Sequence, residues 1–290
     1  MSSAITVPFE TKLSKGEQDA LINLLADEDA SVYQAVKKRI LACGPEADRW
    51  LRPHVLSNDH VLRRHVREVR GCFHRQHADN QFLSFCLRHG EEFALEPGAW
   101  LLAKTAYPDI NVEAYEALLD GYAADLRERI DFDLPSDKIL SAVNRYLFKD
   151  LGFSGNEVNY YEADNSYLNR VLDRRTGNPI TLSLLYMLLA KRLRLPIVGI
   201  GLPGHFICRY QSTSGEFYVD PFNGGQLLTK ADCVHFLQRG NHSLSDDFLA
   251  PVTARRMFLR ICSSLHQIYS EKAQTESVTR FQRYLVALAR

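Results

Sequence analysis

The sequence has no excess of charge of either sign. Its 290 residues include 35 Lys and Arg and 35 Asp and Glu, so the formal net charge at pH 7 is zero. A protein that binds nucleic acid or an acidic membrane through its electrostatic field needs a surplus of basic residues. We therefore expect neither nucleic acid nor membrane among its partners.

A secretory signal and a long apolar run are also missing. The first ten residues, MSSAITVPFE, contain no basic region followed by an apolar stretch. Charged residues interrupt the apolar runs well before the length of a membrane span. The six cysteines are scattered and include no CxxC pair, which is typical of reduced, mostly buried thiols. We expect a cytoplasmic protein.

The sequence lacks motifs for cofactors and metals. It contains no glycine-rich phosphate loop. Cys72, His74 and His77 lie close together in the chain, but their spacing is not that of a zinc site. We interpret such histidines as solvated or singly hydrogen-bonded residues of helices. We expect no cofactor and no metal.

Helical periodicity is present throughout the N-terminal part. From Ser14 to about Arg129, apolar residues recur at steps of three and four. The expected helix breaks are Gly44-Pro45, Pro53, Gly90 and Pro97. Asp79-Asn80 has the composition of a helix start, so we predict that a new helix begins there. No repeat of fixed period is visible, which favours a bundle or an irregular helical array.

The pattern changes after residue 132. Ser136 is the predicted N-cap of a helix that ends at Gly152. The stretch from Asn156 to Ser166 is rich in Asn, Asp and Tyr, which suits an ordered surface loop. We expect this loop to hold the turn at Gly177 in place.

The most informative stretch lies between Arg174 and Gly225. Gly177-Asn178-Pro179 precedes a predicted helix from Thr181 to Leu195 that is apolar on most faces and therefore buried. The runs IVGIGL, HFICRY and EFYVD then have the composition of strands. They place His205 inside one strand and Asp220 at the end of the next. A His oriented by an Asp is two thirds of a thiol-hydrolase triad.

These residues resemble the transglutaminase-like superfamily. In that superfamily a Cys begins a helix after a Gly turn, a His lies on a strand and an Asp follows on the next strand. The resemblance matches His205 to the His and Asp220 to the Asp, while Leu195-Pro196 matches the end of the helix. Counting back from Pro196 by the usual length of that helix places Pro179 where the family has its cysteine.

More narrowly, the chain from about Phe9 onward resembles the bacterial SirB family, in which a helical region precedes such a core. The resemblance implies an α+β fold with three parts: an all-helical N-terminal domain at 1–132, a papain/transglutaminase-like core at 133–250 and a C-terminal helical hairpin at 251–290. The core would pack a central helix on an antiparallel sheet. The hairpin would correspond to one tetratricopeptide-like repeat.

The resemblance to the SirB family is based on four short strings: Tyr160-Tyr161 with Asn165-Ser166-Tyr167, Arg175 with Gly177 through Leu182, Pro203 through Phe206, and Asp220 through Gly225. The pocket and its structural motif are expected to include residues from these strings. These residues are Asn165, Arg175, Gly177, Asn178, Pro179, Gly204, Phe206, Pro221, Phe222 and Gly224.

Two hydroxyls and one thiol are the alternatives to the missing cysteine. Thr181 and Ser183 follow Pro179 closely, but an unactivated hydroxyl is a poor nucleophile, and Thr181 suits a structural role at a helix start. Cys208 lies three positions from His205, so on a strand the two side chains point to opposite faces. We interpret Cys208 as a core thiol.

Two hypotheses about function follow. The favoured one is a non-catalytic transglutaminase-like protein that serves as a regulatory or protein-interaction module with a protein partner. The alternative is a hydrolase or acyltransferase that uses His205 and Asp220 with Thr181, Ser183 or an activated water. The sequence identifies neither the partner nor the oligomeric state.

Overall fold

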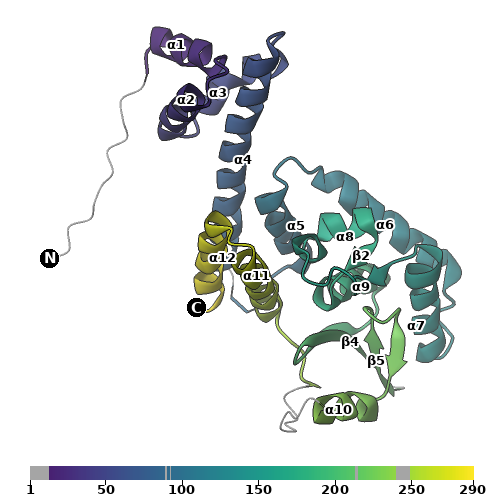
Figure 1. Cartoon of the computed structure of the whole chain (residues 1–290). Coiled ribbons are helices and arrows are strands. Elements are labelled where there is room, and N and C mark those ends of the chain that lie inside the picture. Colours follow the sequence, from purple (N-terminus) through teal and green to yellow (C-terminus); the bar gives the residue numbers. More distant parts are fainter. Residues whose placement is uncertain (1–12, 89, 92, 213–214, 240–248) are drawn as a thin grey trace. The chain divides into compact units, whose positions relative to one another are not determined.

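The computed structural model describes residues 13–88, 90–91, 93–212, 215–239 and 249–290 (Figure 1). Its α-helices are α1 Lys15–Leu25, α2 Ala30–Ala42, α3 Ala47–Leu51, α4 His60–Arg88, α5 Leu95–Ala106, α6 Val112–Arg129, α7 Ser136–Asn144, α8 Leu168–Arg174, α9 Pro179–Leu193, α10 Lys230–Arg239, α11 Ala254–Glu271 and α12 Thr275–Leu288. The strands are β1 Ser154–Gly155, β2 Thr176–Gly177, β3 Ile197–Leu202, β4 His205–Ser212, β5 Gly215–Asp220 and β6 Gln226–Leu228. Short helical turns are η1 Arg52–Leu56, η2 Arg145–Asp150 and η3 Ala163–Ser166.

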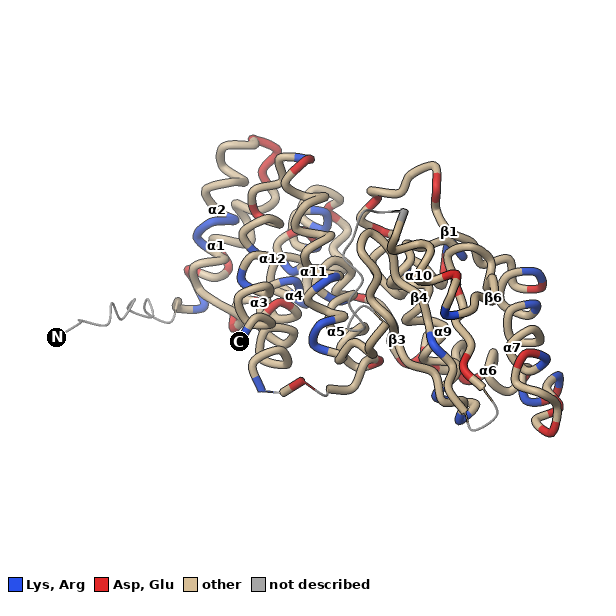
Figure 2. The backbone as a smooth tube through the Cα atoms, turned by 90° about the horizontal axis from the view of Figure 1, so that it is seen from below, with Lys and Arg blue, Asp and Glu red and all other residues tan. Residues whose placement is uncertain are grey.

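The chain forms two compact units. One comprises residues 1–80 with 105–109, and the other comprises residues 81–104 with 110–290. Figure 2 shows acidic and basic residues interspersed along the helices of each unit. No helix in the described ranges is both long enough and apolar enough to cross a membrane.

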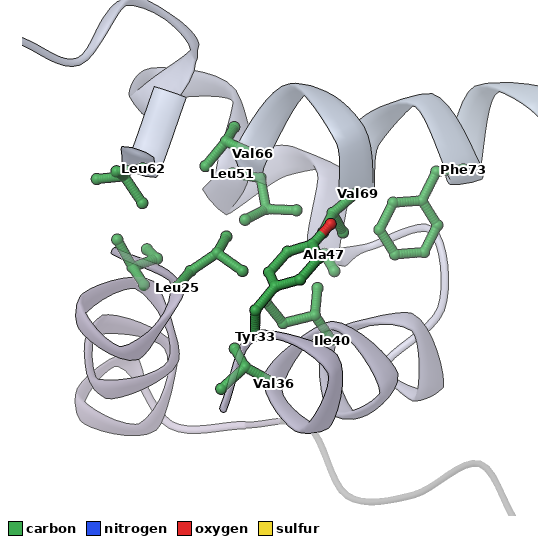
Figure 3. Close-up of a cluster of buried hydrophobic side chains, with 11 residues drawn as sticks. Leu25, Tyr33, Val36, Ile40, Ala47, Leu51, Leu62, Val66, Val69 and Phe73 are labelled. Atoms are coloured by element: carbon green, nitrogen blue, oxygen red, sulfur yellow. The ribbon is translucent and has the colours of Figure 1, made fainter. Parts of the chain in front are cut away.

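The first unit is an array of short helices around one apolar cluster. Ser14 and Glu17 form a capping box at the start of α1, and Asp29 caps α2. The cluster joins buried side chains of α1 to α4, among them Leu25, Ile40 and Val66 (Figure 3). The helical periodicity of the sequence is thus confirmed in this region.

Helix α4 differs from the prediction. It runs without a break from His60 to Arg88, so the predicted helix start at Asp79-Asn80 is wrong. Phe73, Ala78, Phe82 and Cys86 are all buried and continue one apolar stripe through that point. Burial of a continuous stripe outweighs the local preference of Asp and Asn for a cap.

A four-stranded antiparallel sheet lies at the centre of the second unit, in the order β3-β4-β5-β6. Figure 1 shows α9 and α10 on opposite sides of this sheet. Phe206 and Cys208 of β4 point toward α9, where the Cys208 Sγ lies 3.7 Å from the Ser183 carbonyl oxygen. Ile207 points to the other face and packs with Cys233 and Leu237 of α10. The α+β fold with a central helix on an antiparallel sheet is confirmed.

Helix α9 begins two residues before its predicted start. Asn178 is the N-cap, Pro179 is the first helical residue and the helix ends at Leu193, where Arg194 adopts φ 57°. Twelve of its fifteen residues are buried, which explains why apolar side chains occupy most of its faces.

Ser136 does not cap α7. The N-cap is Pro135, and the Ser136 hydroxyl lies 3.2 Å from the Tyr210 hydroxyl. Pro135 has the extended backbone that precedes a helix, so Ser136 becomes the first helical residue and its side chain is used in a tertiary contact. The chain leaves the following helical turn through Gly152, whose φ of 74° is the left-handed conformation predicted there.

Two antiparallel C-terminal helices, α11 and α12, follow as the sequence predicts (Figure 1). Buried aromatic rings of α12, Phe281 and Tyr284, stack edge to face with each other, and Tyr284 meets Phe82 of α4. The buried Arg255 guanidinium donates to the backbone carbonyls of Cys86, Ala287 and Leu288. This hairpin therefore belongs to the same compact unit as the sheet.

Candidate functional site

His205 and Asp220 form a close pair at one end of the sheet. His205 begins β4 after a turn in which Gly204 adopts φ 69°, and Asp220 ends β5. The His205 Nε2 lies 2.7 Å from the Asp220 Oδ2. The side chains are 13% and 6% exposed. The bond links two neighbouring strands and orients the imidazole.

Asp220 is held as a carboxylate. Its Oδ1 accepts hydrogen bonds from the backbone N–H groups of Phe222 and Asn223, and its Oδ2 accepts from the Asn223 side chain at 2.8 Å. Burial by itself would raise the pKa of Asp220, but the hydrogen bond and charge of His205 and the bonds from Asn223 outweigh it and lower the pKa below the ordinary value of 3.8. An ionised Asp220 therefore faces His205 at neutral pH.

Asn223 was missing from the residues predicted from sequence. It lies in the turn Asp220-Pro221-Phe222-Asn223, and the carboxylate bonds the backbone two and three residues further along. That is the pattern of an Asx turn. An Asp-Pro dipeptide with Asn two positions later was the available signal.

Aromatic rings surround the imidazole. The rings of Phe222 and Phe236 lie with their centroids 6.0 and 5.8 Å from that of His205. Because Asp220 takes the Nε2, the Nδ1 is the ring nitrogen left to meet a ligand. His205, Phe222 and Phe236 face a cavity of about 1000 Å³. Tyr160, Tyr161 and Cys233 also line this cavity. Neither Phe236 nor Tyr160 was among the pocket residues predicted from sequence, because the local pattern of α10 and of the loop at Tyr160 does not show that these rings face His205.

Pro179 lies where the resemblance places the missing nucleophile. As the first residue of α9, it lines a smaller cavity of about 230 Å³ together with His205, Gly204 and Phe206. Proline has no thiol and no backbone N–H. This end of α9 therefore supplies neither a sulfur nor a first-residue amide to a reacting group.

A closed hydrogen-bond network, which we call the asparagine network, fixes the start of α9. The Asn178 Oδ1 accepts from the Thr181 N–H at 3.0 Å, and the Asn178 side-chain amide donates to the Ser166 hydroxyl at 3.0 Å. The Thr181 hydroxyl donates to the Asn165 carbonyl oxygen. Asn165 in turn donates to the carbonyls of residues 159 and 160 and accepts from Asn156.

Thr181, Asn165 and Asn178 are therefore placed in a structural network. Thr181 and Asn165 are 0% exposed, and Asn178 is 8% exposed. Thr181 lines neither of the two cavities that His205 faces. The predicted ordered loop does lie against the turn at Gly177, since Asn178 N–H donates to the Asn165 carbonyl.

The remaining predicted pocket residues divide into two groups. Phe206 and Phe222 line the cavities, and Pro221 is buried. Arg175 has a backbone φ of 56°, lines neither cavity and donates a hydrogen bond to the Leu151 carbonyl. Gly224, with φ 67°, shapes the turn after Asp220. At Gly177, a Cβ would lie 3.1 Å from a Val171 methyl carbon, so glycine permits close packing of β2 against α8.

Three other side chains have a hydroxyl or thiol near the site: Ser183, Cys208 and Cys233. Ser183 Oγ donates to the Phe206 carbonyl at 3.3 Å. Cys208 points toward α9 and away from His205, as the strand alternation predicts, and burial raises its pKa. Cys233 does line the larger cavity, but burial raises its pKa to about 12. A thiol with so high a pKa is a poor nucleophile at neutral pH.

Among the residues that the structure describes, no three His, Cys, Asp or Glu side chains lie close enough together to hold a metal ion. His74, one of the three clustered residues noted in the sequence, instead bonds Asp109 through Nδ1 at 2.9 Å.

Parts of this chain are similar to known proteins. Residues 113–263, just over half of the chain, match the family model described as the transglutaminase-like superfamily. A UPF0162 protein of Xylella fastidiosa (strain Temecula1) is 36% identical over 199 residues, which cover 66% of this chain and 70% of that protein. A UPF0162 protein of Vibrio cholerae is 28% identical over 144 residues, 49% of this chain and 53% of that one.

Part of the chain is also similar to a much longer animal protein. F-box only protein 21 of Mus musculus is 38% identical over 113 residues, which are 36% of this chain and only 18% of that protein. No solved structure gives a significant match. The residues matched by the family model include α9, His205 and Asp220. The chain belongs to the transglutaminase-like superfamily and to the bacterial UPF0162 proteins.

Proposed function

We propose that the protein is a non-catalytic member of the superfamily that uses the His205–Asp220 cavity to bind a segment of another protein. The single observation that carries this proposal is Pro179 at the first position of α9, in the same small cavity as His205. The substitution removes the nucleophile. It also removes the backbone N–H at a position from which an oxyanion can be stabilised.

The hydroxyls of α9 are already used elsewhere. Thr181 bonds the Asn165 carbonyl and Ser183 bonds the Phe206 carbonyl, and both side chains are fully buried. A nucleophile must lie within hydrogen-bond reach of its base. Movement of either hydroxyl to His205 would break buried bonds, which argues against a hydrolase or acyltransferase built on them.

The lining of the larger cavity suits a protein segment. Tyr161 and Phe236 are 62% and 44% exposed, and the Tyr160 ring contacts those of Tyr161 and Phe222. Tyrosine and phenylalanine are enriched at protein interfaces because they bury large surfaces at low entropic cost. The His205–Asp220 pair would then orient the bound segment through the His205 Nδ1.

The similarity of part of this chain to a region within a longer protein supports a role as a protein-interaction module. In F-box only protein 21 the matched region is a small part of a long chain. None of the six cysteines here forms a disulfide, which agrees with a reducing compartment. We further propose that the protein acts in the bacterial cytoplasm, in a regulatory role of the kind that the SirB resemblance implies.

A turnover assay tests this proposal. Purified protein is incubated with a panel of peptide, amide and ester substrates, beside the His205→Ala and Asp220→Ala variants. We expect no hydrolysis or acyl transfer that depends on either residue. His235→Ala is the matched control, because His235 lines the same cavity with an exposed side chain and forms no bond to Asp220.

One result would overturn the proposal. Turnover by the natural protein that survives in His235→Ala but disappears in both His205→Ala and Asp220→Ala would show that the pair is catalytic. The water-activating alternative would then hold, with His205 as the base.

A further inference from the structure

The smaller cavity contains a charged side chain that the proposed function does not use. The two cavities share Tyr160, Tyr161, Gly204 and His205 in their linings, so a segment bound in the larger one can extend into the smaller. Helix α11 adds Arg260 to the smaller cavity. Ser264 and Gln267 follow on the same face of that helix, four and seven positions later.

Arg260 differs from the other partly buried arginines. Its guanidinium carbon lies 5.7 Å from the centre of the Phe206 ring, and within the described ranges it forms neither an ion pair nor a hydrogen bond. Arg192, by contrast, meets Glu96 at 2.7 Å and Asp120 at 2.6 Å. No Asp or Glu of the described residues lines the smaller cavity.

The Arg260 guanidinium lies close to β3 and is partly shielded from water. At Gly201, a Cβ would lie 3.3 Å from the Arg260 Nη1, so the guanidinium lies close to β3 at a glycine. Burial lowers the pKa of Arg260, and the nearby Tyr160 acts in the opposite direction. An arginine remains protonated at neutral pH. A partly desolvated cation without a counter-ion is costly unless a ligand supplies the negative charge.

We infer that the smaller cavity is a carboxylate subsite in which Arg260, assisted by the Ser264 hydroxyl, binds an acidic group of the protein segment held at His205. A guanidinium pairs with a carboxylate through two parallel hydrogen bonds. A single arginine matches the single charge of a carboxylate better than the double charge of a phosphate. The inference rests on the proposed function and adds the chemistry of the ligand: a chain terminus or an Asp or Glu side chain.

Three short peptides separate these sources. N-acetyl-Ala-Ala with a free carboxylate represents a chain terminus, N-acetyl-Asp-Ala amide represents an acidic side chain, and N-acetyl-Ala-Ala amide is neutral. Each is titrated into the full chain at constant ionic strength while amide NMR shifts are followed at residues around the two cavities. We expect at least one acidic peptide to bind roughly tenfold or more tightly than the neutral one, since charged hydrogen bonds are strong.

Variants of α11 attribute that preference to Arg260. Arg260→Gln should abolish the difference between acidic and neutral peptides, and Arg260→Lys should retain only part of it because lysine cannot form the paired bonds. Arg256→Gln is the matched control, since Arg256 is exposed on the same helix and lies outside the cavity. It should leave the preference unchanged. Thermal melts establish that each variant is folded.

Equal binding of acidic and neutral peptides, or an unchanged preference in folded Arg260→Gln, would overturn the carboxylate subsite and leave the larger cavity as the binding site. Tighter binding of inorganic phosphate than of either acidic peptide would overturn it as well. Turnover that depends on His205 would refute the proposed function instead, so the two failures are distinguishable.

Discussion

Two polar clusters lie near the start of α9, and they differ in how completely their side chains are hydrogen-bonded within the protein. In the asparagine network, every side chain named above is bonded within the protein, and Asn165 and Thr181 are completely buried. In the His205–Asp220 pair, the carboxylate is satisfied on both oxygens while the imidazole still faces a cavity. The first cluster has the features of a structural support. The second leaves the His205 imidazole able to contact a ligand in the cavity.

The largest effect on stability is expected at Asn165. Asn165→Ala removes three hydrogen bonds from a fully buried position. Each intramolecular hydrogen bond contributes about 1 kcal/mol, so we expect a total loss of about 3 kcal/mol in the free energy of unfolding. Chemical denaturation measures this loss.

The neighbouring Asn159 supplies the control for that experiment. Its side chain is exposed, and its bond to Asn165 is made by the backbone carbonyl. Asn159→Ala should therefore change the free energy of unfolding by less than about 0.5 kcal/mol. Similar losses in the two variants would contradict a structural role for the network.

A smaller effect is expected at Asp220. Asp220→Asn keeps the size of the side chain but removes the charge that faces His205, with an expected loss of about 2 kcal/mol at pH 7. The exposed Asp133 provides a matched control, for which Asp133→Asn should have little effect. Urea denaturation of both variants beside the natural protein measures the differences.

The loss at Asp220 should depend on pH in a defined direction. Because the folded pKa lies below 3.8, the carboxylate contributes its full stabilisation above that ordinary value and loses it as the pH falls through the folded pKa. The difference between Asp220→Asn and the natural protein should therefore shrink below about pH 4. A difference that grew on acidification would contradict the ionised state assigned to Asp220.

Local patterns were sufficient to predict the parts of the site that lie on regular elements. Strand composition placed His205 and Asp220 on adjacent strands, and the Asn-Pro start of α9 placed Pro179 at its first turn. The terminal hairpin was expected from the family resemblance, and the two helical segments of the tail agreed with it. These features depend on residues close together in sequence, where propensity and alternation hold.

Features that depend on tertiary packing were not predictable. The continuous helix α4 results from burial of an apolar stripe that overrides the cap preference of Asp79 and Asn80. Arg260 reaches the site from α11, more than fifty positions after His205, and its periodicity marks it only as one face of a helix. Single-sequence patterns contain no information about which distant helix meets a cavity.

The claim that Pro179 occupies the position of a nucleophile is tested most directly by restoring a thiol there. In Pro179→Cys, the rate of alkylation by iodoacetamide is measured against pH, with the modified position identified by mass spectrometry and with Pro179→Cys/His205→Ala as the comparison. We predict that the introduced thiol titrates below the ordinary cysteine pKa of about 8.5 and that removal of His205 raises this value. An introduced thiol that titrates at the ordinary value in both proteins would show that Pro179 does not occupy the position of a nucleophile.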